Sequence, residues 1–363
     1  MTKKIDVGIL GYGSMGRTHS FAYKVLPLFD PKLSETRLVA VFGRTEANVR
    51  RFAGEYGFET YYTDWKKVVN DDKVDIIDIC TPPSEHSEAA VEALERGKNV
   101  ICEKPLAANL EKAEKMVKAA EKRKGLSMTM FNCRFLPAIQ YAKKLIEENF
   151  LGNIYRFSSS YPRMSLIYPK RYFTWKDKLR PSGGGSLLDL GIHSADLARF
   201  LVGEVEEVSA ATGLYIKERP VKDTEKVETV ETEDTGLVIM RFAGGLLGVL
   251  EATKVATGGE DALRIEINGS KGAVSWSLED PCVLRVFSIE DPEVGWKSIH
   301  ASKSYPFIDG VSQGHLAGIH YFLRCLEKEE APRPSFKDGF RAQEIIDAAY
   351  RSAREGKWVS LSH

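Results

Sequence analysis

Residues 5–16 read Ile-Asp-Val-Gly-Ile-Leu-Gly-Tyr-Gly-Ser-Met-Gly, and this stretch decides the fold. Residues 5–10 form a short, nearly continuous apolar run, which is typical of a strand buried in a parallel sheet. Gly11, Gly13 and Gly16 follow at the spacing G-x-G-x-x-G, and a helical pattern then continues to about Val25. A glycine loop between a strand and a helix is the context in which this motif binds a dinucleotide.

Each glycine of the loop has a physical task. Gly11 allows the tight turn, Gly13 lets backbone amides approach a pyrophosphate, and Gly16 lets the helix pack on the strand. The amides at the helix N-terminus then point at the phosphates. The alternative is a glycine-rich turn without a ligand. We expect the whole loop to bind the cofactor: Gly11, Tyr12, Gly13, Ser14, Met15 and Gly16.

Strand and helix patterns alternate along the rest of the first third. Ser84 is expected to cap the helix that follows Pro82 and Pro83, and Gly97 to end it in the left-handed conformation. The alternation predicts an α/β fold with an N-terminal Rossmann sheet, doubly wound and parallel. Strands are predicted at residues 38–42, 74–80, 99–102 and 127–131, with a short strand at Tyr61.

Composition limits the possible partners. A chain of 363 residues is long for a single core, so two domains are expected, at residues 1–131 and 132–363. Lys plus Arg and Asp plus Glu both number 51, which argues against nucleic acid as the partner and favours a small ligand. The five cysteines have no zinc spacing, so no metal site is expected. The sequence has neither a continuous signal-peptide core nor an apolar run of about 20 residues, so we expect a cytoplasmic protein without a membrane span.

The tip of the second strand reads Phe42-Gly43-Arg44, without the acidic residue that would favour NAD. Arg44 lies beyond the usual distance of about 20 residues from the motif, because residues 27–36 form an insert. Its guanidinium could pair with the 2′-phosphate of NADP or stack on adenine, or it could be an ordinary surface arginine. The pattern favours NAD(P) as cofactor, with a preference for NADP.

Two further motifs end neighbouring parallel strands. Thr81-Pro82-Pro83 with His86 follows one strand, and Glu103-Lys104 with Pro105 ends the next. Ligands of open α/β sheets bind at this carboxyl edge. Lys104 could donate to a substrate hydroxyl there, or it could be a solvated loop lysine.

Residues 183–200 begin with three glycines and continue as a helix that is apolar almost all round, which indicates burial. Asp189, His193 and Asp196 nevertheless share one face of it. A polar stripe on a buried helix costs free energy unless it is paired or functional. A carboxylate beside an imidazole suits acid–base chemistry, and the alternative is a satisfied His–Asp pair in the core. Gly183-Gly184-Gly185 would permit close approach of a ligand, which favours the first interpretation.

These motifs together resemble the Gfo/Idh/MocA oxidoreductase family, from about Lys4 to Val359, most specifically up to Gly203. The resemblance implies a C-terminal α/β domain with a large, open, mostly antiparallel sheet, and oligomers built on that sheet, so we expect a homodimer or homotetramer. It also implies that Lys104 contacts substrate and nicotinamide, that His193 is the acid–base residue, and that Asp189 orients His193. The matching elements are the glycine loop, Thr81-Pro82-Pro83-x-x-His86, Glu103-Lys104-Pro105 and Gly183 to His193.

The second domain supplies further candidates. Residues 161–180 are rich in Tyr, Arg and Trp, and Tyr172 and Trp175 could stack on a sugar ring or pack on a domain interface. Arg134 follows the last parallel strand and is a weaker candidate for substrate binding. Short β-rich runs between residues 154 and 277, joined at one point by Gly244-Gly245, suit a sheet, and residues 339–356 suit a helix. Residues 220–233 are charged and could be a loop or a crossover.

The sequence predicts an enzyme that transfers a hydride between NAD(P) and a secondary hydroxyl or keto group of a sugar, inositol or related polyol. Two other functions are compatible with the same motifs. One is an NAD-dependent glycoside hydrolase of the same family, and the other is a non-catalytic, dinucleotide-sensing regulator.

Overall fold

A computed structural model describes residues 4–122, 125–168, 171–259, 261–293, 295–301 and 311–361. The chain forms two compact units. The first comprises Met1–Asn132 together with Ser312–Phe340, and the second comprises Cys133–Val311 together with Arg341–His363. The chain therefore returns to the first unit near its C-terminal end, a feature absent from the division expected at residues 131 and 132. None of the helices in the described ranges is long and apolar enough to cross a membrane.

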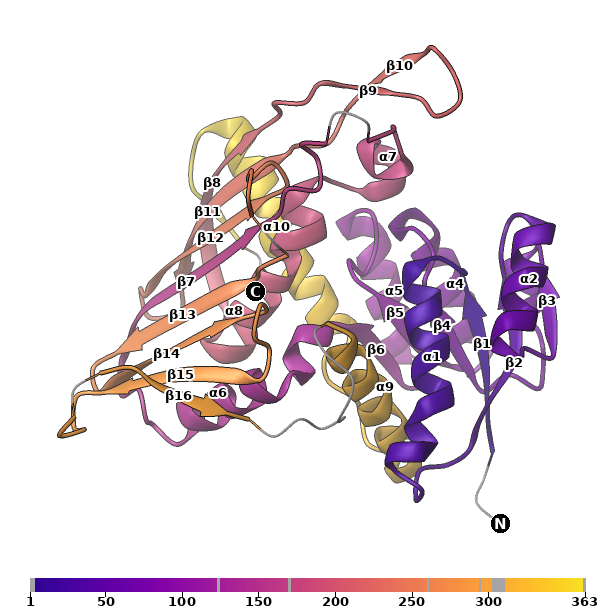
Figure 1. Cartoon of the computed structure of the whole chain (residues 1–363), viewed down its shortest axis with the longest axis horizontal. Coiled ribbons are helices and arrows are strands. Elements are labelled where there is room, and N and C mark those ends of the chain that lie inside the picture. Colours follow the sequence, from indigo (N-terminus) through magenta and orange to yellow (C-terminus); the bar gives the residue numbers. More distant parts are fainter. Residues whose placement is uncertain are drawn as a thin grey trace. The chain divides into compact units, whose positions relative to one another are not determined.

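The first unit contains a parallel sheet of six strands in the order β3-β2-β1-β4-β5-β6 (Figure 1). This is the Rossmann order, and the direction of winding reverses between β1 and β4. The carboxyl ends of these two strands mark the place where such sheets bind ligands. The predicted doubly wound sheet is confirmed. Its strands are Ile5–Leu10, Thr36–Phe42, Thr60–Tyr62, Ile76–Ile79, Asn99–Glu103 and Ser127–Met130, from β1 to β6.

The helices of this unit follow the strands in alternation. They are α1 (Ser14–Phe29), α2 (Glu46–Tyr56), α3 (Trp65–Val69), α4 (Pro83–Glu95) and α5 (Leu110–Lys122). The prediction that Ser84 caps α4 is wrong, because α4 begins at Pro83, with Pro82 as the residue before it. The fixed φ angle of a proline suits the first helical position. Gly97 has φ 74°, as expected for the left-handed residue beyond a helix end.

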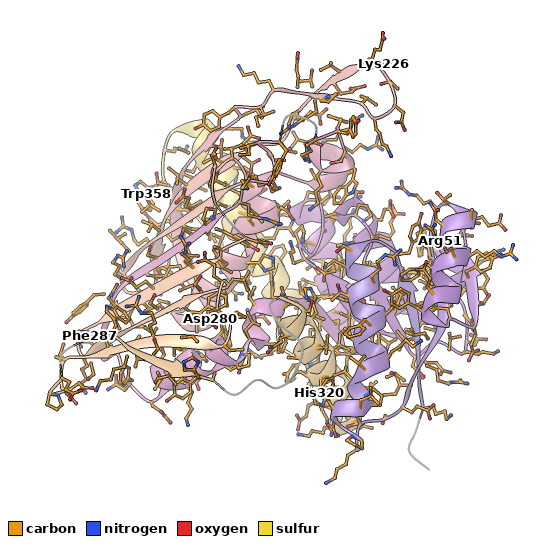
Figure 2. The ribbon with its side chains drawn as sticks, in the orientation of Figure 1. Arg51, Lys226, Asp280, Phe287, His320 and Trp358 are labelled. Carbon is orange, nitrogen blue, oxygen red and sulfur yellow. The ribbon has the colours of Figure 1, made fainter. Side chains whose placement is uncertain are left out.

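Helix α9 (Val311–Lys328) was not predicted from the sequence and joins the first unit late in the chain. His320, labelled in Figure 2, places Nε2 2.9 Å from Oδ2 of Asp30, at the end of α1. Arg324 pairs with the same carboxylate, and Glu327 accepts a hydrogen bond from the Ser34 amide at 2.7 Å. These contacts fix α9 against α1 across almost 300 residues of sequence.

The second unit is built on a nine-stranded sheet in the order β16-β15-β14-β13-β7-β12-β11-β8-β17 (Figure 1). The pairing of β7 with β12 is parallel and the other pairings in this sheet are antiparallel, which confirms the predicted large, open, mostly antiparallel sheet. Gly244 and Gly245, predicted to join two strands, turn between the antiparallel strands β11 and β12 with φ of 85° and 87°. The strands are β7 (Ile154–Pro162), β8 (Val205–Gly213), β11 (Thr235–Phe242), β12 (Leu247–Thr253), β13 (Arg264–Gly269), β14 (Gly272–Ser277), β15 (Val283–Ser288), β16 (Lys297–His300) and β17 (Val359–Ser360).

Helices α6 (Pro137–Glu147), α8 (Ile192–Leu201) and α10 (Phe336–Glu355) lie along one face of this sheet (Figure 1). Alternate residues of β11 show the consequence, since Val238 and Met240 are buried whereas Leu237 and Ile239 are exposed. The opposite face of the sheet therefore carries exposed aliphatic side chains.

Residues 214–233 form an arm rather than an irregular loop. Strands β9 (Glu218–Pro220) and β10 (Val227–Thr229) pair antiparallel, and Lys226 lies at the end of the arm (Figures 1 and 2). Arg219 is buried at the base of the arm and donates to the carbonyl oxygens of Leu166 and Tyr168.

Candidate active site

The glycine loop of the first unit has the geometry that the motif requires. Gly11 has φ 110°, and a Cβ there would lie 2.8 Å from the carbonyl oxygen of Cys80. A Cβ on Gly16 would lie 2.1 Å from the Gly11 carbonyl oxygen, so only glycine lets α1 pack this closely. Around a Cβ on Gly13 the described residues place no atom within 4 Å. The loop therefore packs tightly against the backbone at Gly11 and Gly16, whereas the space beside Gly13 is open to a ligand.

The open side of the loop suits a dinucleotide. Among the described residues no side chain caps α1 at Gly13, and its first turn contains no acidic residue. Its first amides can therefore donate to phosphate oxygens. Thr81 Oγ1, at the end of β4, is buried without a hydrogen-bond partner in the described part of the chain. A buried hydroxyl of this kind is expected to find its partner in a ligand or in water.

Two alanine substitutions should separate packing from cofactor binding. Gly16→Ala is expected to lower the free energy of unfolding by about 1–3 kcal/mol, because the backbone at Gly11 must move. Gly13→Ala should leave the stability of the apoprotein within about 0.5 kcal/mol, because its Cβ meets no protein atom and its φ of −71° suits alanine. It should nevertheless weaken cofactor binding. Urea unfolding and titration with NAD(P)H check both expectations, and unweakened binding by Gly13→Ala would contradict a pyrophosphate site here.

Tyr12 and Arg44 occupy the neighbouring edge of the sheet. The Tyr12 ring packs over Gly43, where a Cβ would come within 2.1 Å of it, and its centroid is 6.2 Å from that of Phe52. Tyr12 therefore turns its side chain toward the protein while its backbone belongs to the loop. Arg44 is exposed just beyond β2, at the position that reads the ribose in this fold.

His86 is fully buried on α4 and contacts backbone carbonyls. Its Nε2 lies 2.8 Å from the Thr81 carbonyl oxygen, and its Nδ1 lies 3.1 Å from that of Pro105. Burial lowers the pKa of this imidazole. The ring therefore joins the loop after β4 to the loop after β5, and these contacts explain its presence without direct contact with a ligand.

Glu103 ends β5 and anchors the backbone of Lys104, whose amide donates to Oε2 at 3.1 Å. Oε1 of Glu103 lies 3.1 Å from Nε2 of His19 and 3.4 Å from Nε2 of His315. Burial opposes ionisation of Glu103, but the hydrogen bonds from both histidines outweigh it and hold its pKa well below the usual range. Neither histidine was predicted from the sequence as a site residue.

His19 connects Glu103 to a second carboxylate. Its Nδ1 lies 2.9 Å from Asp78, and the Tyr23 hydroxyl donates to Asp78 at 3.0 Å. Burial disfavours the charged imidazole, but the Asp78 carboxylate raises the pKa of His19 well above its usual value. Both ring nitrogens face carboxylates, so His19 donates on both sides as an imidazolium. Asp78, His19, Glu103 and His315 thus form a buried chain of polar contacts, and Glu103 within it also holds the backbone amide of Lys104.

In the second unit, the helical segment with Asp189 and His193 changes its winding. Residues Leu187–Gly191 form a π-helical turn, and α8 continues from Ile192. Such turns often occur at functional sites. Two of the three glycines before it have protein groups close by. A Cβ on Gly185 would lie 2.4 Å from Oε2 of Glu233, and one on Gly184 2.3 Å from the Tyr350 hydroxyl, so protein groups approach these glycines where a ligand was expected.

Glu233, which is distant in sequence, caps the start of this segment in place of the local residue Ser186. Its carboxylate accepts hydrogen bonds from the amides of Gly185 and Leu187, each at 2.9 Å, and from the Tyr350 hydroxyl at 2.8 Å. Burial raises the pKa of Glu233. The glycines thus allow the N-terminus of the helix to be held from inside the unit.

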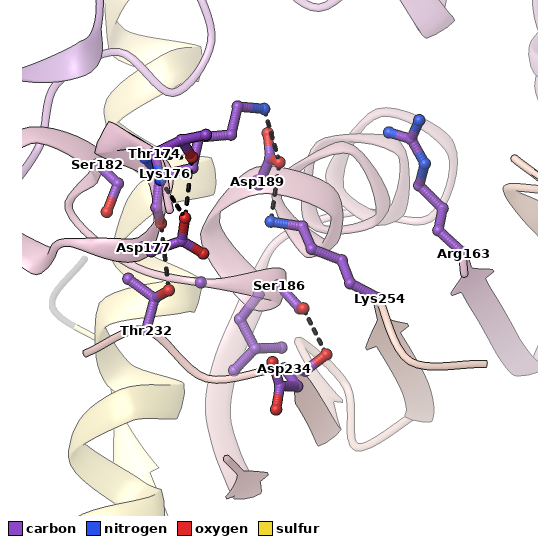
Figure 3. A network of polar contacts seen from close by, with 12 residues as sticks. Arg163, Thr174, Lys176, Asp177, Ser182, Ser186, Asp189, Thr232, Asp234 and Lys254 are labelled. Carbon is purple, nitrogen blue, oxygen red and sulfur yellow. Dashed lines mark hydrogen bonds and ion pairs between the residues drawn. The ribbon is translucent and has the colours of Figure 1, made fainter. Parts of the chain in front are cut away.

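Two lysines converge on Asp189 (Figure 3). Lys254 Nζ lies 2.9 Å from Asp189 Oδ2, and Lys176 Nζ lies 3.1 Å from the same oxygen. The Lys254 side chain is only 9% exposed, whereas that of Lys176 is 47% exposed. The family resemblance implied that Asp189 orients His193, and neither lysine was predicted from the sequence.

His193 is buried on α8, one turn after Asp189. Its Nδ1 lies 3.8 Å from Cys133 Sγ, and its ring centroid is 6.2 Å from that of Tyr161. Burial raises the pKa of the Tyr161 hydroxyl, so it stays protonated.

Asp196 forms a separate pair. Arg134 donates to its two carboxylate oxygens at 2.7 and 2.6 Å, and both side chains are buried. The guanidinium of Arg134 also lies 4.9 Å above the Phe200 ring. These contacts bind Arg134 to two residues of α8.

Tyr172 and Trp175 are exposed, and the Lys176 ammonium lies 5.7 Å from the centre of the Trp175 ring.

The comparisons with known proteins cover the whole of this arrangement. An oxidoreductase family model for an NAD-binding Rossmann fold matches residues 5–131, and the model of the same family's C-terminal alpha/beta domain matches residues 143–361. The chain belongs to the Gfo/Idh/MocA oxidoreductase family. Both the fold and the resemblance drawn from the sequence motifs are thereby confirmed.

Several individual Gfo/Idh/MocA proteins are similar over their full length. Levoglucosan dehydrogenase of Pseudarthrobacter phenanthrenivorans is 31% identical over 99% of this chain and 98% of its own. Myo-inositol 2-dehydrogenase of Thermotoga maritima is 28% identical over 98% of both. A structure of levoglucosan dehydrogenase with NADH has a TM-score of 0.95 at 30% identity, covering 99% of this chain and 100% of that one. We conclude that the chain is an NAD(P)-dependent oxidoreductase that acts on CH–OH groups.

Proposed function

We propose that this Gfo/Idh/MocA protein oxidises a secondary hydroxyl of a cyclic sugar or inositol, or reduces the corresponding ketone. The carrying observation is that Asp189 and His193 lie one turn apart on a buried helical segment that changes from π to α, with two lysines on Asp189. The names of the relatives, levoglucosan dehydrogenase and myo-inositol 2-dehydrogenase, support this substrate class.

The proposed roles follow from the chemistry of each side chain. His193 takes the proton of the hydroxyl or returns it, and Asp189 accepts hydrogen bonds that orient the reacting groups. Lys104, fixed through its backbone to Glu103, donates to the substrate oxygen and stabilises charge on it. Tyr172 and Trp175 offer ring faces to a sugar. A dinucleotide whose pyrophosphate is held at the glycine loop would supply the hydride chemistry through its nicotinamide.

A binding screen followed by turnover measurements tests this function. NAD(H) and NADP(H) are combined with levoglucosan, inositols and simple sugars, and the melting temperature is recorded, since a ligand of the folded state raises it by mass action. Pairs that raise it are then assayed by absorbance of the reduced cofactor. Substrate turnover without net formation of reduced cofactor would favour glycoside hydrolysis by transient oxidation, and no turnover with any polyol would contradict the proposal.

We propose further that Arg44 gives the enzyme a preference for NADP. The guanidinium is exposed at the tip of β2, where no carboxylate faces the ribose in the sequence Phe42-Gly43-Arg44-Thr45. A 2′-phosphate there would gain charge-assisted hydrogen bonds, each contributing about 1.5–3 kcal/mol. Arg44→Ala should therefore raise the Kd for NADPH at least about tenfold and change that for NADH little. Isothermal titration checks this, with the exposed Arg51→Ala as control, and tighter binding of NADH by the unaltered protein would contradict it.

We propose that the open sheet face forms a homodimer or homotetramer contact. Ile239 and Val249 lie opposite each other on β11 and β12, and both are exposed. Leu237 and Leu247 extend the same aliphatic face. Exposed apolar patches of this kind are typical of protein interfaces. Light scattering gives the mass of the particle in solution, and a monomer at micromolar concentration would contradict the proposal.

A further inference from the structure

Lys254 is a buried cation that the catalytic roles above leave unused. It follows directly after β12, and its backbone amide donates to the Asp234 carbonyl oxygen at 2.9 Å. Its ammonium lies 2.9 Å from Asp189 Oδ2, with only 9% of the side chain exposed (Figure 3). Removing a charge of this kind from water is unfavourable unless a partner offsets the loss of hydration. Its burial and the short contact together indicate that Asp189 is the partner that offsets the charge of Lys254.

We propose that Lys254 is a positioning residue, which fixes the Asp189 carboxylate in its ionised form so that it acts as a hydrogen-bond acceptor throughout the working pH range. The inference rests on the proposed function, in which Asp189 serves the same reaction as His193. This contact defines the role of Asp189, because a carboxylate paired with a neighbouring ammonium is a poor proton acceptor. Proton transfer is thereby left to His193.

The charged and titratable groups around Asp189 come from three elements. Lys176 reaches it from the 3-10 turn Trp175–Asp177, Lys254 from the end of β12, and His193 lies one turn further along its own helix. Glu233 is a further carboxylate of this unit on which the positive charge of Lys254 acts. Lys176 is half exposed and its ammonium is also near the Trp175 ring, so solvent weakens its effect. Lys254 is therefore the stronger of the two partners.

The test is the pH dependence of kcat/KM in Lys254→Met, Lys254→Arg and Lys176→Met. An opposite charge within about 4–6 Å changes the titration of a carboxyl group by about 1–3 pH units. Lys254→Met should shift the acidic limb of the profile upward by at least about one unit, which is about tenfold lower activity on the acidic side. Lys254→Arg retains the charge and should restore most of the limb. Lys176→Met should shift it by less than Lys254→Met.

Lys98→Met is the matched control. Lys98 is also only 9% exposed, but it lies in the first unit and donates to the carbonyl oxygens of Asp71 and Val74. Its loss should alter the melting temperature without moving the acidic limb. An unmoved limb in a folded Lys254→Met protein would overturn the inference, as would an equal shift in Lys98→Met. If Lys254→Met does not fold, Lys254→Gln is measured in its place.

Failure of the proposed function has a different signature. In that case the unaltered protein turns over no polyol, or Asp189→Asn retains full activity. If the function holds and only this inference fails, Asp189→Asn is impaired whereas Lys254→Met retains the profile of the unaltered protein.

Discussion

Replacing His193 by alanine is expected to lower kcat about 10²–10⁴-fold, the range that a positioned general acid or base contributes. Replacing Lys104 by methionine should lower kcat about 10²–10³-fold, because a donor to the developing oxyanion is lost. The glycine loop is intact in both variants, so the Kd for NAD(P)H should stay within about threefold. Steady-state kinetics with the best substrate of the binding screen, together with fluorescence titration of the reduced cofactor, check these values.

The controls for this pair are residues of the same type that lie on the surface. His300→Ala removes an exposed histidine from β16, and Lys115→Met removes an exposed lysine from α5 whose partner is Glu111. Both should retain kcat within about twofold. Near-normal turnover in His193→Ala or Lys104→Met would refute the assigned roles. A loss of cofactor binding in Lys104→Met would instead indicate that its main task is to hold the dinucleotide.

The fold was predictable from the sequence because its signals are local. The run Ile5–Leu10 and the glycines that follow up to Gly16 specify a buried strand, a tight turn and the start of a helix. The cap of α4 was misassigned because Ser84 is a good cap by type, whereas Pro83 takes the first helical position by its fixed φ. The local sequence of helix α9 does not indicate where the helix packs, since its partners Asp30 and Ser34 lie almost 300 residues away in the sequence.

The candidate site was only half predictable, for a related reason. The polar pair Asp189 and His193 is visible in the sequence because it interrupts an apolar helix. The surroundings of these residues cannot be predicted from the sequence, because Glu233 and Tyr350 reach Gly184 and Gly185 from distant elements. The glycines are conspicuous in the sequence, but whether a ligand or a carboxylate lies against them depends on the tertiary fold.

The same limit applies to His19 in the first unit. A histidine three residues after Gly16 and an aspartate inside an apolar strand are each unremarkable alone. Only the fold brings His19, Asp78 and Glu103 together in the interior, with side chains at most 5% exposed. A buried polar residue on an otherwise apolar strand, such as Asp78, is the signal that could have pointed to this chain of charges.

His19→Ala is expected to lower the free energy of unfolding by about 3–5 kcal/mol near neutral pH, because it leaves two buried carboxylates without their shared partner. His320→Ala is the control, since its imidazole is partly exposed and Asp30 retains Arg324, so about 1 kcal/mol is expected there. Urea unfolding of both variants measures the difference.

The pH dependence separates this charge effect from the cavity that alanine leaves. The folded-state pKa of His19 is raised, so its stabilisation is complete below about pH 6.5 and is lost as the pH rises through the folded value. The folded-state pKa of Glu103 is lowered, so its stabilisation is present above about pH 4.3 and is lost as the pH falls through the folded value. The loss of unfolding free energy in His19→Ala should therefore be largest between about pH 4.3 and pH 6.5. It should shrink in acid, where the unpaired carboxylates of the variant take up protons. A deficit that stays constant from pH 4 to 9 would mean that His19 contributes packing alone, and that no imidazolium links Asp78 to Glu103.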